Sequence, residues 1–142
     1  MSRIRLFYLI SSVLFLLMGV CVYIIFRDIN HLLIIERIEF LKFTGNAFIE
    51  LKPSHFSNVL KYNLPDMFWF VSGILLLRCI WYEKKKEQNI YLFCFYLMSA
   101  VFEISQLLDI VPGTFDYLDL FFMGIGALVE SFLYKYYVKK GA

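Results

Sequence analysis

The sequence predicts an all-α fold, an integral membrane bundle of four transmembrane helices with an amphipathic helix in the first outer loop. The first observation behind this prediction is composition. Of the 142 residues, 61% are apolar and only 18% are charged, against about 25% charged in a typical soluble domain. A soluble domain of this size buries only about two-thirds of the surface that its unfolded chain exposes. Lipid is therefore the favoured solvent, and the length leaves room for one membrane domain, residues 1–142.

The second observation is a set of four apolar segments, each close to the ~20 residues that a helix needs to cross ~30 Å of hydrocarbon. Backbone groups in lipid must be satisfied within the segment, which favours helices. The first segment follows Arg3 and Arg5 and contains no charge. It is longer than a signal-peptide core, and no small-residue cleavage site follows it, so we expect a retained helix. The predicted helices cover about residues 6–26, 64–82, 90–110 and 117–137.

The longest connection, at about residues 27–63, separates the first two helices. Within it, residues 31–42 place Ile34, Ile38 and Leu41 on one face of a predicted amphipathic helix. Two interpretations of this helix remain open. It lies along the membrane interface, or it connects the spans and packs on the bundle.

The basic residues predict the orientation of the helices. With four crossings, the two termini and the loop between the second and third helices lie on one side, and most acidic residues lie on the other. Lysine and arginine favour the cytoplasmic side, so we expect both termini in the cytoplasm. The residues that carry this prediction are Arg3, Arg5, Lys84, Lys85, Lys86, Lys135, Lys139 and Lys140.

Several polar residues fall inside the predicted helices or at their outer ends. An ionisable group within a spanning helix is costly, which makes it a functional candidate. Glu103 and Gln106 share one face of the third helix, one to two turns below the outer surface. We expect these residues to converge with others on a pocket open to the outside. The predicted ligand-binding residues are Asp66, Trp69, Glu103, Gln106, Asp116 and Asp119.

The polar candidates also have a purely structural interpretation. Aspartate is a preferred N-cap residue, so Asp66, Asp116 and Asp119 are equally candidates for helix caps. Glu103 and Gln106 are candidates for an interhelical hydrogen bond. For these two residues we slightly favour a ligand or catalytic role, because neither lies at a helix end.

Arg78 and Glu130 are predicted at similar depth, toward the cytoplasmic half of the second and fourth helices. Pairing would relieve both charges. Alternatively, the long side chain of Arg78 extends to the cytoplasmic surface, as lysine and arginine side chains do near helix ends. We favour this second interpretation, because Arg78 and Asp66 point in different directions from their helix.

Other kinds of site are not supported by the sequence. Cys21, Cys79 and Cys94 are odd in number, lie in apolar runs and form no CxxC pair, so we expect neither a disulfide framework nor a metal site. His31 and His55 lie in the outer loop and are interpreted as surface residues. The net charge of +2 and the lack of a basic stripe argue against a nucleic-acid partner. No cofactor is expected, and no catalytic residue is assigned.

The polar residues of the C-terminal half form a pattern that resembles the VanZ-like family of small membrane proteins. That family typically shows E-x-x-Q near the outer end of one helix, then a turn, an aspartate-rich helix start and a glycine-rich middle. The resemblance covers about the last 80 residues. Thr114 stands where many members have arginine, and Phe121–Met123 where many have asparagine. The matching residues are 102–106, 112–119 and 124–126, together with the opening 63–69.

The resemblance implies a bacterial cytoplasmic (inner) membrane protein, and the family's namesake is associated with teicoplanin resistance. We expect an accessory or binding protein acting on a polar group at the outer leaflet, either a lipid head group or a cell-wall precursor. The alternative is a metal-dependent membrane hydrolase or transferase, with the carboxylates holding Mg²⁺. Whether the protein is an enzyme stays open. Membrane lipids, a lipid-linked envelope precursor and a second copy of the chain are the expected partners.

Overall fold

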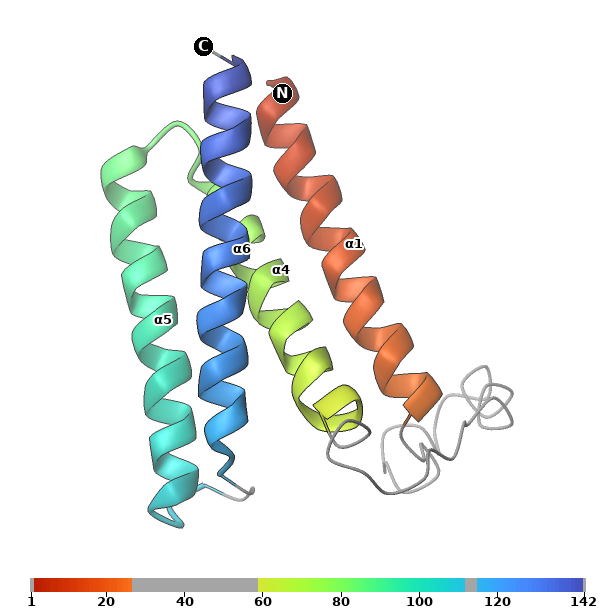
Figure 1. The fold of residues 1–142 in the computed structure, drawn as a ribbon. Helices are drawn as coiled ribbons and strands as arrows, with labels where there is room; N and C mark the ends of the chain where they lie inside the picture. The colour runs from red at the N-terminus through yellow and green to blue at the C-terminus, as the bar shows by residue number, and fades with distance from the viewer. Residues whose placement is uncertain (1, 27–58, 112–114, 142) are drawn as a thin grey trace, which may run out of the picture.

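The computed structural model describes residues 2–26, 59–111 and 115–141. Four long helices stand side by side in these ranges (Figure 1), and no strand occurs among them. All four are long and apolar enough to cross a membrane, which confirms the predicted all-α bundle. The predicted amphipathic helix at 31–42 lies outside the described residues, as do both histidines. The elements are α1 (Arg3–Phe26), the short π-helix η4 (Val59–Asn63), α4 (Leu64–Ile80), α5 (Lys85–Leu107) and α6 (Tyr117–Gly141).

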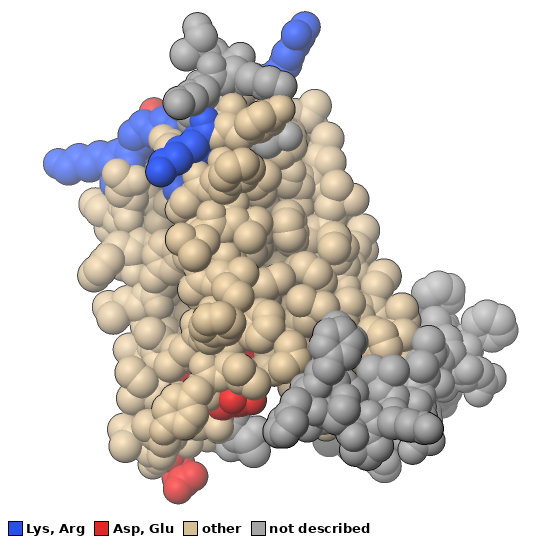
Figure 2. Space-filling model, viewed as in Figure 1, with Lys and Arg blue, Asp and Glu red and all other residues tan. Residues whose placement is uncertain are grey.

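The helices alternate in direction, so that both termini and the α4–α5 turn lie at one end of the bundle (Figure 1). Charge is separated along the same axis. On the face shown in Figure 2, lysine and arginine gather toward the end that holds the termini, most of the visible acidic atoms lie toward the other end, and uncharged residues fill the band between. We call these the basic end and the acidic end of the bundle.

The observed helix bounds differ from the predicted ones mainly in α5. This helix begins at Lys85 rather than near residue 90, because the charged residues before the apolar run continue the same helix. It ends at Leu107 rather than near residue 110. Asp109 adopts a left-handed backbone conformation with φ 56°, which aspartate tolerates better than most residues. The N–H of Asp109 donates to the Gln106 carbonyl at 3.1 Å, which closes the helix end.

Helix α4 is the centre of the bundle and contacts the other three long helices. Its most extensive contacts are with α1, followed by those with α6. Two apolar clusters surround it. One consists of Tyr8, Val71, Leu75 and Cys79, and the other of Phe70, Ile74 and Leu92.

A pair of serines joins α1 to α4 inside this core. The Ser12 hydroxyl donates to the Ser72 carbonyl at 2.9 Å, and the Ser72 hydroxyl donates to the Ser12 carbonyl at 2.9 Å. Both side chains are buried. Small hydroxyl residues suit such an interface because they let two helix backbones approach closely and still satisfy their own polar groups.

Arg78 does not extend to the surface, so the favoured sequence interpretation is wrong. Its guanidinium pairs with the Glu130 carboxylate through Nε and Nη2, the latter donating to Oε2 at 3.2 Å. Nη1 donates to Gln88 Oε1 at 3.1 Å, and the guanidinium lies 4.0 Å from the centroid of the Tyr134 ring. Glu130 is only 1% exposed. Leaving the buried Glu130 carboxylate without a counter-charge would cost more free energy than withdrawing the Arg78 guanidinium from water.

Candidate functional site

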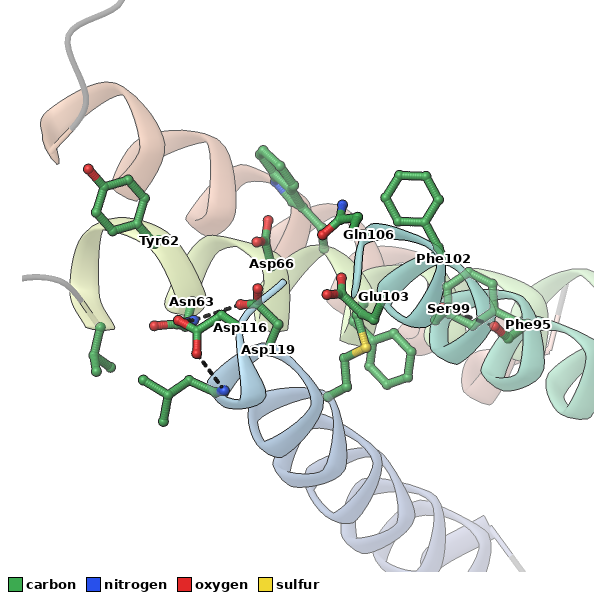
Figure 3. Close-up of a pocket in the computed structure, with 15 residues that line it drawn as sticks. Tyr62, Asn63, Asp66, Phe95, Ser99, Phe102, Glu103, Gln106, Asp116 and Asp119 are labelled. Atoms are coloured by element: carbon green, nitrogen blue, oxygen red, sulfur yellow. Dashed lines mark hydrogen bonds between the residues drawn. The ribbon is translucent and has the colours of Figure 1, made fainter. Parts of the chain in front are cut away.

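A cavity of about 790 Å³ lies at the acidic end of the bundle, where α4 and α6 begin and α5 ends (Figure 3). Its volume falls in the range of about 300–1,000 Å³ that is typical of small-molecule sites. Polar and aromatic side chains from η4 and three of the long helices line it. The lining residues are Val59, Tyr62, Asn63, Asp66, Trp69, Phe70, Phe95, Ser99, Phe102, Glu103, Gln106, Asp116, Leu118, Asp119 and Met123.

All six residues that the sequence singled out lie in this lining. Asp66 and Trp69 come from the first two turns of α4, Glu103 and Gln106 from the last two turns of α5, and the other two from the start of α6. The indole of Trp69 also packs against Gly19 and the ring of Tyr23 on α1, with ring centroids of Trp69 and Tyr23 5.7 Å apart. The structure thus brings the candidates together, while their binding role stays a prediction.

Aromatic residues form the floor of the cavity and hold α5 away from α4. The rings of Phe70 and Phe95 stack with centroids 5.4 Å apart and planes inclined by 24°. The Phe95 ring covers Gly73. A Cβ atom added to Gly73 would lie 2.6 Å from the Cζ atom of Phe95. Large rings therefore fill the α4–α5 interface on the side of the cavity that faces the basic end. Nearer the acidic end, the two helices stay apart and leave the space that the polar residues line.

Asn63 links two of the acids that form the cavity wall. Its Nδ2 donates to Asp119 Oδ1 at 2.6 Å and points to Asp116 Oδ2 at 3.4 Å. Asn63 is buried, so these bonds connect the start of α4 to the start of α6 in a place largely hidden from solvent. One amide group carries two donors, which allows it to serve both carboxylates.

The capping interpretation holds for Asp116. Its Oδ1 accepts the N–H of Leu118 at 2.9 Å, at the start of α6. Asp119 lies inside the first turn of that helix, where the helix dipole favours negative charge. In α4, Asn63 rather than Asp66 occupies the N-cap position, and Asp66 lies in the first turn. Of the three aspartates, only Asp116 is thus the N-cap of its helix.

Glu103 is the acid of the wall that is most withdrawn from solvent. Its side chain is 7% exposed, and its Oε2 atom has no hydrogen-bond partner among the described residues. Figure 3 shows its carboxylate directed into the space that it shares with Asp66, Asp119 and Gln106. Among the described residues, Glu103 does not make the predicted interhelical hydrogen bond. Buried polar atoms are nearly always paired, so an unpaired one indicates a ligand, a water or a strained site.

Several lining residues were not among the sequence candidates, and they include Asn63, Phe70 and Phe95. A signal for Phe95 is present, because Phe95, Ser99 and Glu103 are spaced four apart and share one face of α5. A signal for Asn63 is also present. It directly precedes the Leu-Pro-Asp sequence that begins α4, and asparagine is a preferred residue at such a helix start.

The described ranges contain no cluster of metal-ligating side chains and no disulfide. No three histidine, cysteine or acidic side chains there come close enough to hold a metal ion. All three cysteines are free thiols; Cys79 is buried, while Cys21 and Cys94 lie on the outside of the bundle.

Fold and site together define a small all-α protein with four helices able to cross a membrane and an acidic cavity at one end. Comparison of the chain with protein-family models, with curated proteins and with solved structures gives no match. The resemblance to the VanZ-like family therefore stays a prediction.

Proposed function

We propose that this chain is a multi-pass protein of the bacterial cytoplasmic membrane that binds the polar group of a membrane amphiphile. That amphiphile is a lipid or a lipid-linked cell-wall precursor. The observation that carries the proposal is the cavity at the acidic end, with the buried Glu103 carboxylate in its wall, whose Oε2 has no hydrogen-bond partner among the described residues. With the basic end in the cytoplasm, the cavity faces the outer leaflet.

The chemistry of the lining suits a molecule with one polar and one apolar end. Asp66, Glu103 and Asp119 provide a polar wall, while Phe95 and Met123 provide apolar surface. The polar residues lie within two turns of the helix ends, near the outer boundary of a hydrocarbon core ~30 Å thick, where the polar and apolar parts of an amphiphile meet. A soluble polar ligand would gain little from the aromatic floor.

We further propose an accessory role in the cell envelope, linked to antibiotic or envelope-stress resistance. The support for this role is the VanZ-like pattern, whose E-x-x-Q residues are Glu103 and Gln106 and whose aspartates are Asp116 and Asp119. These four residues lie around one cavity, as residues with a common function would.

The test is photolabelling in lipid nanodiscs with an alkyne-tagged phosphatidylethanolamine that carries a diazirine in its acyl chain. We expect labelled peptides from the cavity lining. Met123→Trp fills the cavity and should reduce this labelling at least about fivefold. Met98→Trp is the matched control, because Met98 is 71% exposed on the outside of α5. It should label like the unaltered protein. Equal labelling of cavity peptides in both variants would contradict the proposed function.

A further inference from the structure

We infer that the group held in the cavity is cationic, an amine or a quaternary ammonium, bound by the carboxylates of Glu103 and Asp119 over the aromatic floor. This inference rests on the proposed function and specifies the chemical class of its ligand. Three independent features of the lining support it.

The first feature is the sign of the charge. The described lining carries four carboxylates, on Asp66, Glu103, Asp116 and Asp119, and neither lysine nor arginine. The nearby Lys61 does not line the cavity, and its Nζ lies 5.3 Å from the centroid of the Tyr62 ring. Among the charged side chains of the described lining, an anionic group such as a phosphate would meet only like charge, which is unfavourable by several kcal/mol when the groups are desolvated.

The second feature is the burial of Glu103, which separates this cluster from an ordinary solvated acidic surface. A surface carboxylate satisfies its oxygens with water. Glu103 Oε2 is buried and lacks a partner among the described residues, and the carboxylate faces the cavity (Figure 3). A buried carboxylate is stabilised by a nearby positive charge and destabilised by a negative one. An ammonium placed in the cavity supplies both the missing hydrogen bond or contact and the counter-charge.

The third feature is the aromatic surface that lines the same cavity as the acids. Trp69, Phe70, Phe95 and Phe102 all contribute to the lining. The faces of aromatic rings attract cations, and cages of such rings recognise quaternary ammonium groups. Acidic and aromatic side chains in one cavity form the combination that suits an organic cation, whereas a phosphate site requires N–H donors and basic side chains.

The experiment is a competition against the photolabelling described above. Three amphiphiles with the same tetradecyl chain are compared at equal mole fraction in the bilayer: tetradecyltrimethylammonium, tetradecyl phosphate and tetradecyl maltoside. We expect the ammonium to suppress labelling of the cavity peptides at a mole fraction about tenfold lower than the phosphate, which corresponds to ~1.4 kcal/mol. Glu103→Gln should remove most of this preference. Glu87→Gln should retain it, since Glu87 is exposed at the other end of α5.

Soluble tetramethylammonium distinguishes the source of the cation. Competition by it supports the inference and indicates a free cation as ligand, whereas competition by the ammonium amphiphile alone indicates a head group. If Glu103→Gln does not accumulate in the membrane, Asp119→Asn is compared in its place. Equal or stronger competition by the phosphate would overturn the cationic inference. The proposed function would still stand in that case, provided Met123→Trp loses its labelling.

Discussion

The Arg78–Glu130 ion pair shows that the stability of this bundle depends on single side chains. Glu130 is almost completely buried, and its partner also bonds to Gln88 and lies over Tyr134. In a low-dielectric interior, removing one member leaves the other as an uncompensated charge. The two residues therefore form one unit, because a change at either position leaves the other charge unpaired.

Arg78→Leu should lower the free energy of unfolding by about 3–5 kcal/mol, the usual effect of leaving a buried charge unpaired. The double variant Arg78→Leu, Glu130→Leu should recover a large part of the loss, because it removes both charges. Arg3→Leu is the control, since Arg3 is exposed, and it should stay within about 0.5 kcal/mol of the unaltered protein. Unfolding by SDS in mixed micelles, followed by circular dichroism, measures these differences. A double variant no more stable than Arg78→Leu would contradict this account.

At the residue scale, the sequence singled out acidic residues more readily than small neutral polar ones. Glu103 and Asp119 were candidates because a carboxylate in an apolar segment is costly and therefore informative. Asn63, Ser12 and Ser72 were not, because small neutral polar residues are common in spanning helices and do not reveal their partners. The direction of Arg78 was predicted wrongly, since it depends on a counter-charge that another helix supplies.

Helix α1 packs against α4 at a glycine. A Cβ atom at Gly19 would collide with the indole of Trp69 and lie 3.2 Å from the Pro65 carbonyl oxygen. Neither neighbour yields easily, because one is a rigid ring and the other is backbone. By contrast, a Cβ at Gly124 on α6 would meet no atom of the described residues within 4 Å. These two positions make a matched pair for testing the helix contact.

Gly19→Ala should destabilise the protein, because overpacking typically costs about 1–3 kcal/mol and exceeds the gain of about 1 kcal/mol in helix propensity. Gly124→Ala should be neutral or stabilising by up to about 1 kcal/mol. Thermal unfolding in detergent, followed by circular dichroism, compares the two. If Gly19→Ala were as stable as Gly124→Ala, the close α1–α4 contact at this site would be ruled out.

At the element scale, the sequence predicted which segments form helices but not how they pack. Length and hydropathy located all four helices, with errors of a few residues at their ends. The packing order is harder, because lipid and neighbouring helices are both apolar, so a spanning helix carries no clear mark of its buried side. The separation of α5 from α4 depends on the Phe95 ring over Gly73, a contact between residues 22 positions apart in the chain.

At the scale of the whole molecule, charge is distributed along the bundle axis. The termini and the α4–α5 turn share the basic end, and the candidate site lies at the acidic end. Under the positive-inside rule, this arrangement predicts that the basic end lies in the cytoplasm. The sequence predicted the separation of charge because it requires only an even number of crossings. It also predicted a pocket open to the outside, but not the aromatic floor of Phe70 and Phe95, which arises from contacts between side chains on different helices.

The predicted orientation is tested by labelling single cysteines in intact cells with a membrane-impermeant maleimide, after replacement of the native cysteines. Ile110→Cys should be labelled from outside, since Ile110 is 69% exposed in the α5–α6 turn. Lys85→Cys, in the exposed first turn of α5, should be labelled only after the cells are permeabilised. The reverse pattern would place the termini outside and the cavity toward the cytoplasm.

The apolar cluster of Phe70, Ile74 and Leu92 lies along the helices between the cavity and the Arg78–Glu130 pair. Electrically, this cluster is a layer of low dielectric constant on the inner side of the cavity. A transmembrane voltage falls mainly across such a dry layer, at about 2.3 kcal/mol per charge for each 100 mV. A cation that enters the cavity from the acidic end stays on one side of the layer and crosses little of the field. The membrane voltage should therefore have little influence on occupancy of the site.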